Sequence, residues 1–187
     1  MKVEYLDLAK IDEIYNGALQ NDFPPQEIKP FDVIKALYEN GEYFACGLFD
    51  EEELVGYAMF CEDEKSGYVL LDYLAIKEER RNQGMGKFFL YMLKKLLDEK
   101  TAMLIESEAV TPEDSDEVVR TRMRRQRFYK RNGCLEMDAS VTLFSTKLDV
   151  LLLPCGGFCD RKQAFRALQR IYARMLPDSK DVTLTLN

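Results

Sequence analysis

The amino-acid sequence predicts a mixed α/β (α+β) fold in which helices flank one mostly antiparallel sheet. Two alternating segments, 42–50 and 53–63, meet at a tight acidic turn, as in a β-hairpin. The apolar segment 67–76 then leads through a glycine-containing loop into an amphipathic helix and a further strand. Helices precede these strands and another follows them, without the strict strand–helix alternation of a fully parallel sheet.

The N-terminal elements follow from residue spacing. Residues 2–6 alternate as in a short strand, and residues 8–19 carry apolar side chains at helical spacing. Three prolines within residues 21–30 predict a long stiff loop. Residues 31–38 predict a second helix, which ends near a glycine at the usual C-cap position.

The remaining elements follow a charged loop at 77–85. We expect a helix at 86–100, a strand at 102–110, a helix from about 112 to 132, strands at 134–140 and 141–154, a helix at 161–176 and a closing strand at 181–187. No internal repeat or low-complexity linker divides the chain. We therefore expect one domain over residues 1–187.

Composition bounds the class of protein. The chain has 187 residues, of which 47% are hydrophobic and 32% charged, the balance of an ordinary globular protein. Its first residues lack the uninterrupted apolar segment of a signal peptide, and no run approaches membrane-spanning length. These observations predict a cytoplasmic protein with no membrane partner. Its oligomeric state, monomer or homodimer, is left open.

The chain contains five cysteines and no histidine. The odd number of cysteines argues against a disulfide framework. Without histidine, Ser–His and Cys–His nucleophiles are excluded and few zinc ligands remain, so we expect no metal. Acid–base chemistry then falls to carboxylates, Tyr, Lys, Cys or the substrate.

A basic segment interrupts the acidic chain. Residues 120–131 hold seven Arg or Lys and no acid, although the net charge of the whole chain is −7. Such a segment could contact nucleic acid. Because many acids precede it, a helix that pairs with them and lines a small anionic ligand site is the preferred interpretation, with no nucleic-acid partner.

The loop "RNQGMGKFF" at 81–89 places two glycines before a helix. The N-terminus of a helix has free N–H groups and favours an anion, and glycines let a phosphate approach the backbone. A dinucleotide fingerprint needs a third glycine where Phe89 stands. A Walker A loop needs a glycine at Arg81 and Ser or Thr at Phe88, so both nucleotide motifs fail.

Three segments, taken together, are more specific than the glycine pair. Residues 81–86 resemble the R/Q-x-x-G-x-G/A pyrophosphate motif of the GNAT superfamily of acyl-CoA-dependent N-acetyltransferases. "LAI" at 74–76 stands where that superfamily has an L-A-V strand ending, and "RFYKRNGC" at 127–134 resembles its F-Y-x-x-x-G-F segment. The resemblance covers residues 2–137 and leaves 138–187 as further strands and a helix of the same domain.

The resemblance implies a GNAT-like fold, a sheet splayed between the strands at 67–76 and 102–109, and acetyl-CoA as co-substrate in the gap. Backbone N–H groups would hold the CoA pyrophosphate, and a strand edge would pair with the pantetheine arm. The implied cofactor-binding residues are Leu74, Ala75, Ile76, Arg81, Asn82, Gln83, Gly84, Met85, Gly86 and Lys87.

The resemblance also suggests catalytic residues. Tyr129 would protonate the departing thiolate, although a Tyr beside Phe128 could equally be a core aromatic. Asp72, Glu106, Glu108 and Glu27 are the candidates for accepting the proton of the amine, directly or through water. Asp72 interrupts an apolar strand, and Glu106 shares one strand face with Glu108. Of these, we single out Tyr129, Glu106 and Asp72 as catalytic candidates.

Two departures from the family pattern stand in the basic helix. Arg122 and Arg125 occupy positions where the family often has Asn and Ala. They could hold CoA phosphates, select an anionic acceptor, or pair with nearby acids. Cys134, where Phe is common, is a smaller change.

The sequence thus predicts an N-acetyltransferase that moves an acetyl group from acetyl-CoA to a primary amine of a small molecule or peptide, by direct attack in a ternary complex. A ping-pong route through Cys46 or Cys61 is a formal alternative. A non-catalytic acyl-CoA sensor and a nucleic-acid-binding protein are the rivals from other classes. Acetyl-CoA turnover and salt-dependent nucleic-acid binding would discriminate them.

Overall fold

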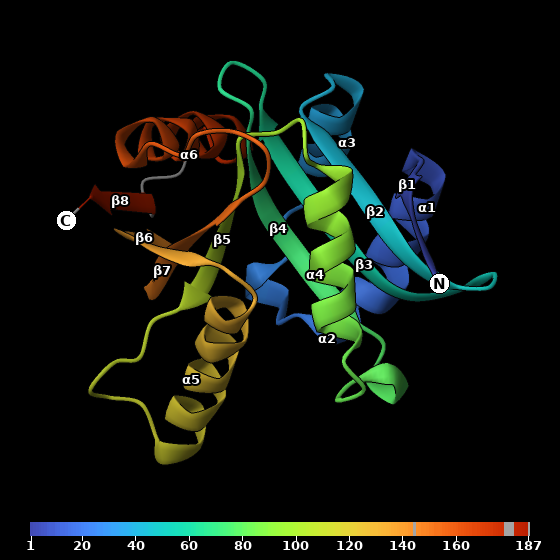
Figure 1. Cartoon of the computed structure of the whole chain (residues 1–187), viewed down its shortest axis with the longest axis horizontal. Helices are drawn as coiled ribbons and strands as arrows, with labels where there is room; N and C mark the ends of the chain where they lie inside the picture. Colours follow the sequence, from blue (N-terminus) through green and yellow to red (C-terminus); the bar gives the residue numbers. More distant parts are fainter. Residues whose placement is uncertain (144, 178–181, 187) are drawn as a thin grey trace.

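The computed structural model describes residues 1–143, 145–177 and 182–186. Within them, eight strands form one sheet in the order β1-β2-β3-β4-β5-β7-β6-β8, flanked by helices (Figure 1). The pair β4–β5 is parallel and the other neighbouring pairs are antiparallel, so the predicted fold class is confirmed. The strands are β1 Lys2–Leu6, β2 Tyr43–Asp50, β3 Glu53–Asp63, β4 Tyr68–Ile76, β5 Ala102–Glu108, β6 Leu135–Leu143, β7 Thr146–Pro154 and β8 Val182–Leu186.

Helices cover both faces of the sheet. They are α1 Leu8–Ile14, α2 Gln20–Asp22, α3 Phe31–Glu39, α4 Met85–Leu96, α5 Asp116–Arg131 and α6 Arg161–Met175, with short π- or 3₁₀-helical turns at Tyr15–Leu19, Pro25–Glu27 and Glu78–Arg80. One buried cluster joins α1, α3 and α6 to the sheet, and a second joins α4 and α5 to the opposite face. Alternate residues of β4, such as Leu70 and Leu71, belong to the two clusters in turn.

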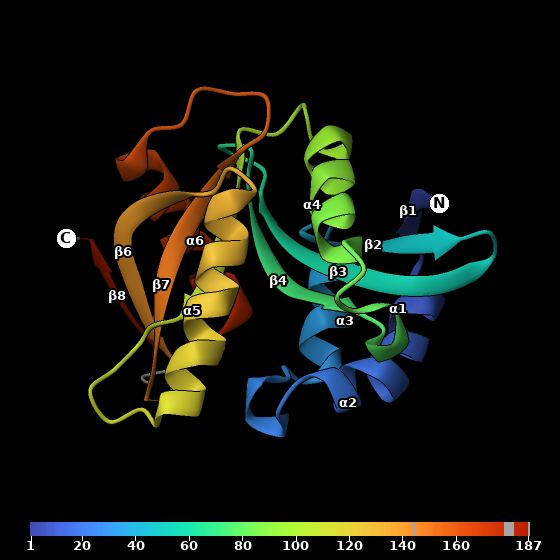
Figure 2. The ribbon, with the colours of Figure 1, turned by 60° about the horizontal axis from the view of Figure 1, so that its bottom comes forward.

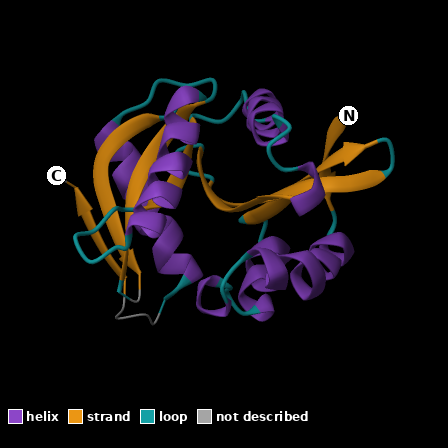
Figure 3. Cartoon of the chain, turned by 90° about the horizontal axis from the view of Figure 1, so that it is seen from below, coloured by secondary structure: helices purple, strands orange, loops and turns teal. Residues whose placement is uncertain are grey.

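The sheet opens between its two central strands. β4 and β5 are paired only from Tyr68–Leu71 to Ala102–Ile105, although both strands continue beyond these residues. The halves β1–β4 and β5–β8 therefore diverge, as Figures 2 and 3 show. The divergent ends leave strand edges facing each other without a ladder between them. Such unpaired edges can accept an extended ligand.

A β-bulge lies where the divergence begins. Met59 of β3 is opposite Tyr73 and Phe60 is opposite Leu71, which leaves Asp72 as the extra residue on β4. A bulge bends a strand and redirects its side chains. Asp72 and Tyr73 consequently lie toward the same face, that of α1 and α3.

The predicted helix boundaries need three corrections. The first helical segment continues through a π-helical turn to Asp22 and ends at Phe23, because the residue before Pro24 is driven to extended geometry. α5 begins at Asp116 rather than near 112, because Ser115 caps it and Asp114 accepts the Thr111 N–H in a preceding turn. α4 ends at Leu96, four residues early, since Lys100 turns away and its carbonyl accepts the Gly156 N–H.

The predicted boundary between the strands at 134–140 and 141–154 is wrong. β6 continues to Leu143, and β7 begins at Thr146. A bulge between Glu136 and Ser140, with Asp138 at a φ of 50°, absorbs the irregularity without ending β6. The predicted strand at 181–187 is present as Val182–Leu186, and its first and last residues lie outside the described part.

Candidate active site

A cleft of about 380 Å³ lies between the divergent ends of β4 and β5. Its floor and sides come from both strands, from the N-terminal segment between α2 and α3, and from α5, α6 and the β6–β7 turn. Its charged and phenolic lining residues include Glu27, Lys29, Asp72, Arg81, Glu106, Glu108, Arg125, Tyr129 and Tyr172. The cleft therefore brings together the three predicted catalytic residues, which are far apart in sequence.

The glycine-containing loop ends beside this cleft at the N-terminus of α4. Gly84 has a φ of 82°, a left-handed conformation that favours glycine, and Phe88 donates the first helical hydrogen bond to its carbonyl. The N–H groups of the residues between them precede the helical ladder. A Cβ built on Gly84 would meet no protein atom within 4 Å, so space remains next to these donors.

Arg81 has a role within the protein. Its backbone N–H donates to the Glu78 carbonyl at 3.1 Å. Its side chain donates to the Ile76 carbonyl at 2.8 Å and forms an ion pair with Asp22 at 2.7 Å. Arg81 thus joins the loop to α2 across one side of the cleft.

The predicted pantetheine edge lies on β4. Leu74, Ala75 and Ile76 pair with β3 on one side, and they line the cleft on the other. Their β5-facing edge begins after Leu71, where the parallel pairing stops. The free edge lines the cleft, and Gly84 and Lys87 at the N-terminus of α4 line a second hollow between α4 and the end of α5.

Asp72 is held in a buried ion pair. Its two carboxylate oxygens accept from Lys29 Nζ at 2.5 Å and from the Tyr43 hydroxyl at 2.7 Å. The Lys29 and Asp72 side chains are only 12% and 5% exposed. Burial disfavours the charged ammonium, but the Asp72 carboxylate outweighs it and raises the pKa of Lys29. The Lys29 ammonium thus compensates the negative charge of Asp72 inside the protein.

Tyr73 completes the attachment of the N-terminal segment. Its hydroxyl accepts the Lys29 N–H and donates to the Glu27 carbonyl, each at 3.0 Å. The bulge places this ring and Asp72 on the same face. Together they hold Lys29 and Glu27 against the cleft.

Glu106 faces the same cleft from β5 and has no ion-pair partner among the described residues. The Tyr172 hydroxyl of α6 lies 2.8 and 2.9 Å from its two carboxylate oxygens. Burial raises the pKa of Glu106 to about 7, although the Tyr172 hydrogen bond and Lys29 oppose the shift. A carboxylate with this pKa can exchange protons near neutral pH.

Tyr129 reaches the cleft from α5. It is only 8% exposed, and its ring packs edge-on against Phe128 at 5.2 Å. Burial raises its pKa to about 12, so the phenol is protonated at neutral pH. Among the described residues its hydroxyl has no hydrogen-bond partner, which leaves the donor available to a ligand.

Glu27 and Glu108 also line the cleft. The Glu27 carboxylate has no hydrogen bond or ion pair within the described part of the chain, and burial and the nearby Glu108 raise its pKa. Glu108 differs, because it accepts from Arg122 and Arg125, each at 3.0 Å. Glu106 and Glu108, which the sequence places on one strand face, both line the cleft.

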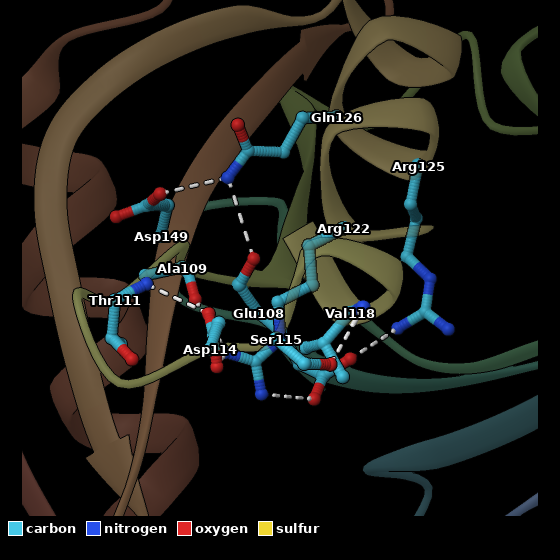
Figure 4. A network of polar contacts seen from close by, with 10 residues as sticks. All are labelled: Glu108, Ala109, Thr111, Asp114, Ser115, Val118, Arg122, Arg125, Gln126 and Asp149. Atoms are coloured by element: carbon cyan, nitrogen blue, oxygen red, sulfur yellow. Dashed lines mark hydrogen bonds and ion pairs between the residues drawn. The ribbon is translucent and has the colours of Figure 1, made fainter. Parts of the chain in front are cut away.

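The two arginines of α5 share Glu108 as a partner and differ in their exposure (Figure 4). Arg122 is partly buried and donates to the Ala109 carbonyl at 2.8 Å, to Asp114 at 2.7 Å and to Glu108. These contacts match the prediction that it pairs with nearby acids. Arg125 is 49% exposed and lines the cleft, where Glu108 is its ion-pair partner.

Cys46 and Cys61 lie away from the cleft lining. Both thiols are fully buried in the sheet, and burial raises the pKa of each to about 12. A protonated, enclosed thiol is a poor nucleophile. Neither thiol is therefore placed to carry a ping-pong route.

The sequence matches the family model described as "Acetyltransferase (GNAT) family" over residues 8–133, more than half of the chain. The chain belongs to the GNAT family of acetyltransferases. The family assignment confirms the predicted resemblance and establishes this GNAT protein as an acetyltransferase. A comparison with curated proteins gave no match.

Several solved structures share the GNAT fold. A protein described as an acetyltransferase from Bacteroides thetaiotaomicron is 17% identical, with a TM-score of 0.73, covering 96% of this chain and 100% of the other. An aminoglycoside 6′-N-acetyltransferase complexed with coenzyme A is 13% identical, with a TM-score of 0.59 and coverages of 86% and 100%. Mutant forms of a spermidine/spermine N-acetyltransferase from Vibrio cholerae are 12% identical, with a TM-score of 0.59 and coverages of 90% and 98%.

Sequence reasoning missed two contacts that define this GNAT site. Lys29 was only part of a proline-rich loop, and Tyr172 stood in a helix with no recognised motif. The interruption of an apolar strand by Asp72 was a signal that a buried partner must exist. Nothing in the sequence indicated that Tyr172 would contact Glu106, which is 66 residues away.

Proposed function

We propose that this GNAT acetyltransferase transfers the acetyl group of acetyl-CoA to a primary amine by direct attack in a ternary complex. The observation that carries the proposal is the convergence of Glu106 and Tyr129 on one cleft, beside the free β4 edge and the N-terminus of α4. An acid and a base with different pKa values can then act on opposite sides of one thioester.

Residues 74–76 would pair with pantetheine, and the turn at 82–87 would supply N–H donors to the pyrophosphate. Gly84 fits such a phosphate, because its left-handed backbone and the open space beside it admit an approaching anion. Lys87 is exposed at the same helix end and adds a positive charge. Arg81 would act mainly through its ties to Asp22 and Ile76.

Glu106 would accept the proton of the incoming ammonium, directly or through a water. The neutral amine nitrogen would bond to the thioester carbonyl carbon as the carbon–sulfur bond breaks. Tyr129 would donate a hydrogen bond and then a proton to the leaving thiolate, and the proton that the new amide nitrogen loses would return to the phenolate, directly or through a water. Its raised pKa keeps the phenol protonated, and the same buried surroundings would raise the pKa of the thiol. Asp72, with both oxygens engaged, would position Lys29 and the cleft wall.

The proposal also includes the predicted domain extent, location, partners and oligomeric state. The single continuous sheet supports one catalytic domain over the 187 residues. No described helix is long and apolar enough to cross a membrane. A cytoplasmic location, independence from metal and nucleic acid, and the choice between monomer and homodimer stay predictions.

Acetyl-CoA binding by Gly84→Ala tests the cofactor site, with Gly41→Ala as its matched control. Gly41 also has a positive φ, 76°, and a Cβ there would meet only Glu64 Oε1 at 3.9 Å. Both variants carry similar backbone strain, of the order of 1 kcal/mol. We expect calorimetry to show roughly tenfold weaker binding for Gly84→Ala alone, about 1.4 kcal/mol. Equal affinities in the two folded variants would contradict the assignment.

A further inference from the structure

We propose that the acceptor is an aliphatic diamine or polyamine, with one ammonium group held at Glu106 and a second at Glu27. This inference rests on the proposed acetyl transfer and names the substrate class of the same cleft. It comes from the charges and the apolar surface of the cleft walls.

The cations of the cleft are already neutralised. Eight charged residues line it: the acids Asp22, Glu27, Asp72, Glu106 and Glu108, and the bases Lys29, Arg81 and Arg125. Each base has an acid of the cleft as its ion-pair partner, at 2.5 Å for Lys29, 2.7 Å for Arg81 and 3.0 Å for Arg125. An anionic acceptor would therefore find no free cation among these residues.

Two carboxylates are left without a cation. Glu106 has only the Tyr172 hydroxyl as a direct partner, and the Glu27 side chain has none in the described part of the chain. Burial raises the pKa of both carboxyl groups. The charge of Glu108 raises the pKa of Glu27 further and Arg125 lowers it, while Asp72 raises the pKa of Glu106 and Lys29 lowers it. A bound cation favours the ionised form of such a carboxylate. Two uncompensated acids thus match two positive charges.

Apolar side chains share the cleft with these acids. Phe23, Leu143 and Leu148 line the same cleft and are partly buried against the core. A methylene chain can contact them without leaving a polar group unsatisfied, whereas a hydroxyl-rich acceptor would lose hydrogen bonds to water there. The walls therefore fit a linear aliphatic linker between the two ammonium groups.

The Tyr129 hydroxyl is an independent sign that a ligand occupies this space. The residue is more than nine-tenths buried, lines the cleft, and has no hydroxyl partner among the described residues. The hydroxyl oxygen is not among the fully enclosed polar atoms without a partner, so it is open to the cleft and free to donate to a ligand there. In the proposed complex the thioester sulfur is that partner, which places the reacting ammonium at the Glu106 end.

The test compares acceptors of matched length. The probes are 1,4-diaminobutane, 1,5-diaminopentane, n-pentylamine and 5-aminopentanoate, followed by CoA release and by mass spectrometry of the product. We expect kcat/KM for the better diamine to exceed that for n-pentylamine by at least about tenfold, or 1.4 kcal/mol, with 5-aminopentanoate slowest. Glu27→Gln should lower the diamine-to-monoamine ratio about tenfold. Glu113→Gln removes the same charge from an exposed site outside the cleft and should preserve the ratio.

Each contrary result has a separate meaning. If diamines are not acetylated, or are no better than n-pentylamine, the diamine inference is wrong even when acetyl-CoA binds and another amine reacts. A ratio that falls equally in Glu27→Gln and Glu113→Gln would also overturn it, because the effect would then be the general field of an acidic protein. Failure of acetyl-CoA to bind, measured separately by calorimetry, would instead contradict the proposed function.

Discussion

The two sides of the active-site cleft treat their central carboxylate differently. On the β4 side, Asp72 is paired with Lys29 and accepts the Tyr43 hydroxyl. On the β5 side, Glu106 has the Tyr172 hydroxyl as its only hydrogen-bond partner within the described part of the chain, and its pKa is raised to about 7. A compensated charge stabilises a wall, whereas an uncompensated one is available for proton transfer. This difference indicates that Asp72 on β4 stabilises the wall of the cleft, whereas Glu106 on β5 is the group available for acid–base chemistry.

Replacing the uncompensated carboxylate should have the largest effect. Glu106→Gln keeps an acceptor for Tyr172 but cannot take a proton, so we expect the single-turnover rate to fall about 10³-fold, within the usual range for a general base. Acetyl-CoA affinity should change little. Asp149→Asn, a carboxylate outside the cleft lining, is the control. A Gln variant with the parent rate would remove Glu106 from the chemistry.

At alkaline pH, Glu106→Gln should be at least as stable as the parent protein. Because the folded-state pKa of Glu106 is raised from 4.5 to about 7, the folded protein binds this proton more tightly than the unfolded chain. Stability is therefore lost as pH rises through that interval, and Gln avoids this loss. We expect Tm of Glu106→Gln at pH 8 to equal or exceed that of the parent.

Breaking the compensated pair should instead affect folding. Asp72→Asn leaves the Lys29 ammonium enclosed without its counter-ion, so we expect the free energy of unfolding to fall by about 3 kcal/mol, measured by urea denaturation. Glu4→Gln breaks the exposed Lys2 pair and should cost less than about 1 kcal/mol. If the two losses are similar, the Lys29–Asp72 pair does not hold the wall.

Replacing Tyr129, the general acid of the proposed reaction, should have the next largest effect. Tyr129→Phe removes an unpartnered hydroxyl, so stability should hold within about 1 kcal/mol while the chemical step slows roughly 10²-fold. Acetyl-CoA affinity should be nearly unchanged. Single-turnover kinetics separates this step from product release. A Phe variant as fast as the parent would leave Tyr129 as core packing.

The smallest effect is expected at the phenol that supports Glu106. Tyr172→Phe removes a donor that favours the ionised carboxylate, so the pKa of Glu106 should rise further. The rate should fall a few-fold at pH 7 and recover at higher pH, about 0.5–1 kcal/mol in all. A loss that is equal at every pH would indicate a packing role for Tyr172.

The sequence predicted the parts of this molecule that depend on local pattern. The hairpin of β2 and β3, the glycine-containing loop, α4 and the divergent strands follow from spacing and from the family resemblance. The errors arose where one side chain decides a boundary. Asp114 stabilises a turn before Ser115, so α5 begins later than predicted. The bulge at Asp138 lets β6 continue beyond Ser140, where the sequence predicted its end.

The site was predictable only in part. Asp72, Glu106 and Tyr129 could be selected from the sequence as candidates, but their partners could not. Lys29 approaches Asp72 across 43 residues and Tyr172 approaches Glu106 across 66, contacts that only the folded chain creates. These partners separate a neutralised carboxylate from a reactive one, which residue type alone does not.

The pH dependence of kcat/KM for the amine, at saturating acetyl-CoA, tests the central claim most directly, because kcat/KM reports the pKa of Glu106 before the amine binds. For the parent, kcat/KM should rise with pH through about 7, as Glu106 ionises, well below the pKa near 10.4 typical of an alkyl ammonium. In Glu106→Gln this rise near 7 should disappear, leaving only the dependence set by the amine. A rise near pH 7 that persists unchanged in Glu106→Gln would contradict the assignment of Glu106 as the base.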